Sequence, residues 1–236
     1  MPSSWNKGFT KDTHPSIRKI SESMINKKID NFYNWRKEMQ RKGRFPTPDS
    51  YLEYSPNLAE YIGVVLGDGN ISTFPRTERI IISCDSNKPG FVDRYAIITE
   101  RLFMKKPTVS KIKGVNGIRI SLYQKEISRR LGIPTGNRSG SNFKIPSWIL
   151  NDRINLIKFL RGLYEAEGSF CVHKPTSTYK LLFYNKNKSL RTAVFDSLLL
   201  LGFHPHQSGY QVQLSRKIEV FACKNLIEFR KYSKIY

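Results

Sequence analysis

Two acidic residues, Asp68 and Glu167, each end an apolar stretch and are each followed by glycine. Glycine commonly follows the last residue of a helix, so both stretches are predicted to be helices. A carboxylate in a last turn is locally unfavourable, because that end of the helix dipole is negative. If the two helices pack together, the carboxylates repel each other unless a cation lies between them. Carboxylate oxygens with phosphate nearby favour Mg²⁺, so we predict a metal site at Asp68 and Glu167.

The two stretches belong to an internal repeat with an offset of 99 residues, in which Leu58–Gly69 aligns with Ile157–Gly168. Small residues recur four positions apart in both copies, at Gly63 and Gly67 and at Gly162 and Ala166. Such spacing leaves a flat notch on one helix face. Because glycine inside a helix costs about 1 kcal/mol relative to alanine, two notches predict close contact between the two helices.

Each copy predicts the order helix, two strands, helix, two strands, short helix, which is an α+β fold. The first copy is expected at 57–67, 70–74, 79–84, 89–104, 108–113, 117–123 and 125–131. The second is expected at 152–166, 169–174, 179–184, 189–201, 204–207, 210–215 and 216–232. Alternation within Ile118–Tyr123 places isoleucine and leucine on one face and Arg119, Ser121 and Tyr123 on the other. This period is typical of an antiparallel sheet with one open face.

The chain has 236 residues, with 40 Lys plus Arg against 19 Asp plus Glu, so its formal net charge is +21. A polyanion, with nucleic acid first, is the expected partner, and we expect most of this charge on the open sheet faces and the N-terminal segment. A hydrophobic content of 39% excludes a disordered basic tail. Apolar runs such as Ser197–Phe203 are too short to span a bilayer, and no signal peptide is evident. Three scattered cysteines favour an intracellular location, of unspecified compartment, over a disulfide or zinc framework.

The two motifs, Tyr61–Gly69 and Leu160–Gly168, resemble the signature motifs of LAGLIDADG homing endonucleases. The resemblance covers about residues 57–236. It implies a monomer of two pseudo-symmetric αββαββα halves, whose curved antiparallel sheets form a saddle on the major groove of double-stranded DNA. The motif helices would form the central interface, with Asp68 and Glu167 as catalytic residues of a staggered double-strand cut with 3′ overhangs. Leu66 departs from the family's acidic residue at that position, whereas Glu165 keeps it. Because that position lies on the opposite helix side from the catalytic one, we expect Glu165 to be structural.

The domain organisation is predicted as a basic accessory DNA-binding arm and linker (1–56), a first half with its connecting loop (57–145) and a second half (146–236). Within the arm, 16–24 and 27–42 are expected to be helical, and 45–50 reads as a linker. The segment Trp5–Thr10, with Ile17–Ser21, resembles small nuclease-associated modules found beside homing endonuclease cores. That resemblance implies extra DNA contact outside the central site.

Further site residues follow from the repeat and the resemblance. Backbone carbonyls of Gly67 and Ala166 are expected to help hold Mg²⁺, a site that Mn²⁺ or Ca²⁺ can also occupy. Asn185 and Lys186 are favoured as catalytic helpers, with Lys88 or Asn87 as their counterparts and Lys113 and Lys144 as further candidates. The DNA-reading candidates are open-face side chains able to contact base edges: Arg79, Ser83, Lys111, Lys113, Arg119, Ser121, Tyr123, Lys180, Tyr184, Gln211 and Gln213.

Three other functions remain open at the level of sequence. The same fold serves intron RNA maturases, which would bind intron RNA rather than cut DNA. A catalytically inactive DNA-binding regulator is a second possibility, and a basic ribosome-associated protein is a third. Acids at both motif ends favour the nuclease, and they have no role in the ribosomal alternative.

Overall fold

The computed structural model describes residues 6–27, 32–42, 51–138 and 140–232. The chain divides into two compact units, with the boundary between residues 47 and 48. The first unit contains helix α1 (Pro15–Asn26) and helix α2 (Tyr33–Arg41). The sequence predicted both helices, although α2 begins six residues later than expected. Trp5, residues 28–31, the whole expected linker 45–50 and Ser139 lie outside the described residues.

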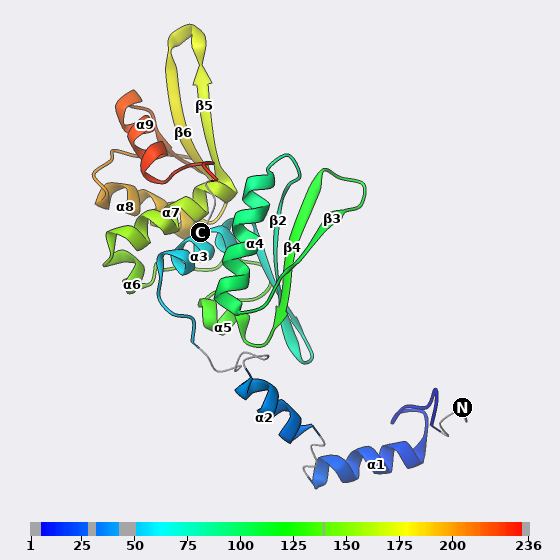
Figure 1. The fold of residues 1–236 in the computed structure, drawn as a ribbon. Coiled ribbons are helices and arrows are strands. Elements are labelled where there is room, and N and C mark those ends of the chain that lie inside the picture. Colours follow the sequence, from blue (N-terminus) through cyan, green and yellow to red (C-terminus); the bar gives the residue numbers. More distant parts are fainter. Residues whose placement is uncertain (1–5, 28–31, 43–50, 139, 233–236) are drawn as a thin grey trace. The chain divides into compact units, whose positions relative to one another are not determined.

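The second unit consists of two halves with the same order of elements (Figure 1). The first half contains α3 (Pro56–Asp68), β1 (Gly69–Phe74), β2 (Thr77–Asp85), α4 (Pro89–Phe103), β3 (Thr108–Ile112), β4 (Gly117–Gln124) and α5 (Ile127–Leu131). The second contains α7 (Arg153–Glu167), β5 (Gly168–His173), a 3₁₀ turn η1 (Lys174–Thr176), β6 (Thr178–Tyr184), α8 (Lys188–Leu200), β7 (His206–Ser208), β8 (Gln211–Leu214) and α9 (Lys217–Leu226). Each half carries a four-stranded antiparallel sheet, in the orders β1-β2-β4-β3 and β5-β6-β8-β7. The predicted α+β fold with duplicated halves is therefore confirmed.

The two motif helices, α3 and α7, lie side by side at the centre of this unit (Figure 1). Their glycines are the points of contact: a Cβ added to Gly63 would lie 2.3 Å from the Phe159 carbonyl oxygen. One added to Gly162 would lie 2.0 Å from the Glu60 carbonyl oxygen. The backbones thus approach more closely than any side chain allows, which confirms the predicted notch. The surrounding positions of both helices are buried, as their apolar composition requires.

Polar residues set where the motif helices begin. The Ser55 hydroxyl accepts a hydrogen bond from the Leu58 N–H, and Pro56 follows in the first turn of α3. The Asp152 carboxylate accepts from the Asn155 N–H at 2.8 Å and begins α7. Each motif helix then runs through its acid, Asp68 or Glu167, so that the acid is the last helical residue of both.

Three local features differ from the sequence-based expectation. A short helix, α6 (Ser147–Leu150), precedes α7 and was not predicted. The final helix α9 ends at Leu226 rather than at residue 232, because Glu228 and Arg230 adopt positive φ angles of 50° and 54°. The turn between β5 and β6 is two residues longer than that between β1 and β2, since His173 pairs with Thr178 whereas Phe74 pairs with Thr77. The second strands, β2 and β6, therefore correspond at an offset of 101, whereas the first strands, β1 and β5, keep the offset of 99. Among the described residues, no helix has the length and apolar character needed to cross a membrane.

Candidate catalytic centre and nucleic-acid interface

The carboxyl ends of α3 and α7 meet, and the two acids meet with them. A Cβ added to Gly67 would lie 2.4 Å from the Ala166 Cβ and 3.2 Å from the Glu167 Cγ. Protein atoms around Asp68 raise the pKa of its carboxyl to about 7, although part of the residue remains open to solvent. The charge of Glu167 raises this pKa as well, and the charge of Lys88 lowers it. The sequence correctly placed the two acids in each other's electrostatic field.

The two acids have different neighbours at the ends of the second strands. Asn185 donates a hydrogen bond from Nδ2 to the Glu167 carboxylate at 3.3 Å. Burial raises the pKa of Glu167, and this hydrogen bond opposes the rise. Gly168 pairs with Phe183 and Gly69 with Ile82, so the strand position that corresponds to Asn185 is Cys84. The expected counterparts Asn87 and Lys88 therefore lie beyond the equivalent strand position, although Lys88 still acts on Asp68 through its charge.

The donor set around the acids is made of oxygen. Two carboxylates stand at helix ends, where the last backbone carbonyls lack a partner within the helix and Gly67 and Ala166 lie among them. The part of the chain that the structure describes holds no group of three or more His, Cys, Asp or Glu that could bind a metal. A metal here would take the two carboxylates together with carbonyls, water or a ligand's own oxygens. That set suits Mg²⁺, Mn²⁺ or Ca²⁺ better than zinc.

An arginine that follows the last helix of each half holds the carboxyl end of that half's motif helix. Arg138, from the segment that joins the halves, donates from Nη2 to the carbonyls of Val65 at 2.8 Å and Gly69 at 2.5 Å. Arg230, beyond α9, donates from Nη2 to the carbonyl of Gly168 at 3.1 Å. Gly69 and Gly168 follow the two acids directly and occupy equivalent positions. The sequence analysis assigned no role to either arginine, because the gap-free offset of 99 residues does not align them.

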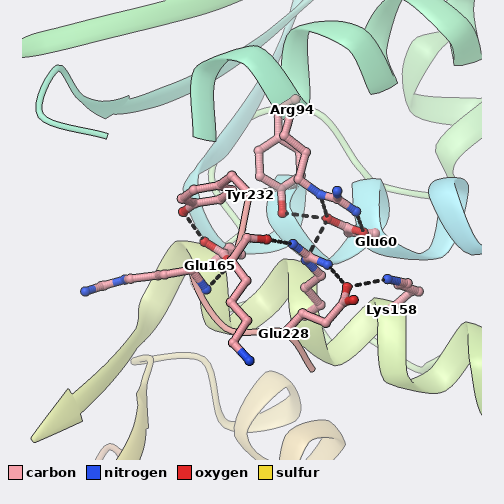
Figure 2. A network of polar contacts seen from close by, with 10 residues as sticks. Glu60, Arg94, Lys158, Glu165, Glu228 and Tyr232 are labelled. Atoms are coloured by element: carbon pink, nitrogen blue, oxygen red, sulfur yellow. Dashed lines mark hydrogen bonds and ion pairs between the residues drawn. The ribbon is translucent and has the colours of Figure 1, made fainter. Parts of the chain in front are cut away.

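Glu165 has the structural role expected of it. Its carboxylate accepts hydrogen bonds from the Arg230 backbone N–H at 2.6 Å and from the Tyr232 hydroxyl. Figure 2 shows this contact beside a second one, in which Arg161 and Lys158 of α7 bind the Glu228 carboxylate. The acid that the second motif keeps therefore anchors the C-terminal segment. The corresponding Leu66 is simply buried.

A buried ion-pair network joins the two halves (Figure 2). Glu60 of α3 is fully buried and accepts two hydrogen bonds from Arg94 of α4, at 2.5 and 2.6 Å. The guanidinium of Arg161, from α7, lies 3.3 Å from the same carboxylate. Breaking one partner of such a network leaves an uncompensated charge in the interior. The network therefore ties the motif helices together by charge as well as by close packing.

The open face of the first sheet carries most of the side chains predicted for it. Arg79 lies opposite Tyr123, and Ser83 lies opposite Arg119. Ser121 pairs with Ile81, which places it on the same face. The Arg79 guanidinium stacks over Tyr123 and also over Phe74, a residue that the sequence analysis missed. These contacts hold Arg79 in place before any ligand arrives.

The open face of the second sheet is also the one predicted. Tyr184 lies opposite Gln211, and Gln213 lies opposite Leu182. Lys180 lies opposite Cys171 and, two residues along β6 from Leu182, shares its face. His206 and Ser208 of β7 pair with Gln213 and Gln211, so they join this face as residues that the sequence analysis did not name.

Some predicted site residues lie elsewhere. Lys111 pairs with Ile118, so it lies on the face opposite Arg119, because β3 runs in the alternate register to the one assumed. Lys113 follows the end of β3. Lys186 and Lys144 line a groove of about 920 Å³ between the connecting segment and α8.

The distribution of charge also differs from the expectation. Within the strands of the described residues, the open faces carry only Arg79, Arg119 and Lys180 as basic side chains with a permanent charge. Most of the excess positive charge of +21 therefore lies outside the strands.

No protein-family model matches this chain, and no curated protein matches it either. Solved structures do. Variants of the homing endonuclease I-DmoI are 20% identical, with a TM-score of 0.52 over 73% of this chain and 94% of that one. I-DmoI in complex with DNA and Mn is 19% identical, with a TM-score of 0.51 over 76% and 98% of the two chains. The N-terminal LAGLIDADG domain of DUF199/WhiA is 13% identical, with a TM-score of 0.52 over 78% and 89%. This protein therefore has the LAGLIDADG fold, which confirms the resemblance at the level of fold.

Proposed function

We propose that this protein is a site-specific homing endonuclease that makes a metal-dependent, staggered double-strand cut in a long DNA target. One observation carries the proposal: two carboxylates of a strongly basic protein are held together at the touching ends of two buried helices. Repulsion and burial make this arrangement unfavourable unless a cation joins it. Solved structures of the same fold are described as I-DmoI complexes with DNA and Mn, DNA and Ca, and target DNA with Mg.

Asp68 and Glu167 are proposed as the metal-binding and catalytic acids, one for each DNA strand. A divalent ion bound there, with the carbonyls of Gly67 and Ala166, would polarise the scissile phosphate and lower the pKa of an attacking water. Asn185 orients the Glu167 carboxylate through its hydrogen bond. Lys88 supplies positive charge near Asp68, and Lys186, which lines the neighbouring groove, is proposed as a helper that contacts a phosphate.

The open faces of the two sheets are proposed to lie in the major groove on either side of this centre. Arg79, Arg119 and Lys180 supply charge there, and glutamine, serine and tyrosine side chains supply hydrogen bonds to base edges. One chain supplies both acids, so a monomer suffices for a double-strand cut. Residues 1–56 would add DNA contact outside the core.

The proposal is tested by cleavage of DNA with the purified protein. A cleaved target is first selected from a pool of randomised duplexes in the presence of Mg²⁺. Asp68→Asn and Glu167→Gln are expected to lower double-strand cutting by at least about 100-fold while leaving DNA affinity within about threefold. Asp93→Asn and Glu100→Gln change exposed carboxylates of α4 and are the matched controls.

Full cutting by either acid variant would overturn the catalytic assignment. Selective binding of duplex DNA without any cutting in Mg²⁺ or Mn²⁺ would instead favour the inactive regulator. Preferential binding of a folded intron RNA over every duplex would favour the maturase.

A further inference from the structure

The two arginines that hold the helix ends have a common geometry and equivalent places in the two halves. Arg138 reaches Gly69 from the connecting segment after α5, and Arg230 reaches Gly168 from the C-terminal segment after α9. Pairing of the strands makes Ile120 of β4 equivalent to Val212 of β8, an offset of 92 residues, and the same offset places Arg138 on Arg230. Each half therefore places a guanidinium at the carbonyl that follows its acid.

The energetics of the helix ends supply the reason. Each motif helix ends in a carboxylate at the negative end of its own dipole. The repulsion between the carboxylate and the dipole destabilises the last turn of the helix. A guanidinium bound to the carbonyl of the next residue places a fixed positive charge beside that end and gives the carbonyl a charged donor. Asp68 and Glu167 each directly precede the glycine that the arginine binds. The arginine therefore fixes the backbone beside each acid, while the carboxylate itself stays available to bind a metal.

The conformation of the C-terminal segment places Arg230 at the Gly168 carbonyl. Glu228 and Arg230 both adopt left-handed φ angles, which are unfavourable for non-glycine residues and persist only where neighbouring contacts hold them. Side chains of α7 contact this segment at both residues (Figure 2). Glu165 holds the Arg230 N–H and the Tyr232 hydroxyl, and Arg161 holds the Glu228 carboxylate.

Tyr232 extends the segment to the other half. A Cβ added to Gly90, at the start of α4, would lie 2.6 to 2.8 Å from Tyr232 side-chain atoms. The C-terminal segment therefore contacts α7 of the second half and the start of α4 of the first half.

We propose that Arg138 and Arg230 are positioning residues, each of which fixes one catalytic acid, Asp68 and Glu167 respectively, so that loss of either arginine slows the cutting of one DNA strand. The inference rests on the proposed function, because it assumes that each acid serves one strand. It makes the two cuts separable through residues whose guanidiniums bind backbone carbonyls rather than the acids themselves.

The test uses the full chain, its selected target and a different label on each strand. Arg138→Met and Arg230→Met are expected to slow cutting of opposite strands by about tenfold or more, as small displacements of a reacting group do, and to accumulate nicked DNA. The lysine variants at both positions keep one charged donor and are expected to recover part of the rate. Arg101→Met, at an exposed position of α4, is the matched control and should cut both strands at the wild-type rate.

The outcomes separate the inference from the function it rests on. If the wild-type protein cuts neither strand of any DNA, the proposed function fails and this inference fails with it. If the wild-type protein cuts but both arginine variants slow the two strands equally, only the inference is overturned. Should Arg230→Met fail to fold, Tyr232→Phe replaces it, since it removes one anchor of the same segment. That variant must slow the strand opposite to the one slowed by Arg138→Met, and equal slowing of both strands would refute the inference.

Discussion

The contact between the motif helices makes a quantitative prediction for Gly162→Ala. The new Cβ would lie 2.0 Å from the Glu60 carbonyl oxygen and 2.7 Å from the Val64 nitrogen, and both are backbone atoms that no side-chain rotation can move. Carbon atoms at this position do not approach closer than 3.0 Å, so α3 and α7 must separate by about 1 Å. The same separation loosens the Glu60 network that joins the halves.

The expected loss of stability follows from two opposing effects. Replacing glycine by alanine inside a helix stabilises it by about 1 kcal/mol. Overpacking of a tight core costs about 1–3 kcal/mol and occasionally more, and here two backbones and a buried ion pair are displaced together. We expect a net loss of about 2–4 kcal/mol in the free energy of unfolding, or about 5–15 °C in Tm for a unit of this size.

Thermal and urea unfolding followed by circular dichroism measure this loss. Gly140→Ala is the matched control, because its new Cβ meets nothing within 4 Å and its φ is not left-handed, and it should leave Tm unchanged within about 2 °C. A Gly162→Ala protein as stable as the wild type would refute the close-contact account of the motif helices. An equal loss of stability in Gly162→Ala and Gly140→Ala would also refute that account.

Two further predictions test the open faces and the C-terminal anchor. Cys171 is exposed on the open face of the second sheet, whereas burial raises the pKa of Cys84 to about 11 and that of Cys223 to about 12. A maleimide at pH 7.5 should therefore label Cys171 first. Long duplex DNA at low salt should slow the labelling of Cys171. Equal labelling rates with and without DNA would show that this face does not bind DNA. Hydrogen bonding and the charges of Lys158 and Arg161 hold the pKa of Glu228 below its ordinary value, so its stabilising contribution is present at neutral pH and is lost as the pH falls through that lowered pKa. Glu228→Gln should accordingly flatten the acid side of a plot of unfolding free energy against pH, below about pH 4.5, and an unchanged acid side would contradict the anchor.

Much of the fold and the centre of the site could be predicted from the sequence, because both depend on local and repeated patterns. Glycine spacing within the motif helices predicted their contact, since only residues without a side chain permit such an approach. Alternation in β4 and β8 predicted the open faces. The position of Asp68 and Glu167 followed from the repeat alone.

Register and convergence could not be predicted in this way. A turn two residues longer in the second half made Cys84, rather than Asn87 or Lys88, the counterpart of Asn185. Alternation within β3 could not say which of its faces is open, so Lys111 was assigned to the wrong one. Turn length and strand pairing depend on two segments together, so the residue pattern of a single strand cannot predict either of them.

The amino-acid sequence by itself determined the duplicated α+β architecture, the contact of the motif helices and the pairing of two acids at their ends. Only the tertiary structure decided what surrounds those acids: the buried network of Glu60, the anchoring role of Glu165 and the arrival of Arg138 and Arg230 at equivalent carbonyls. The physical reason is range. Helix periodicity and glycine notches act over a few residues, whereas Arg138 and Arg230 meet their partners across more than 60 positions of the chain, where no local pattern records the contact.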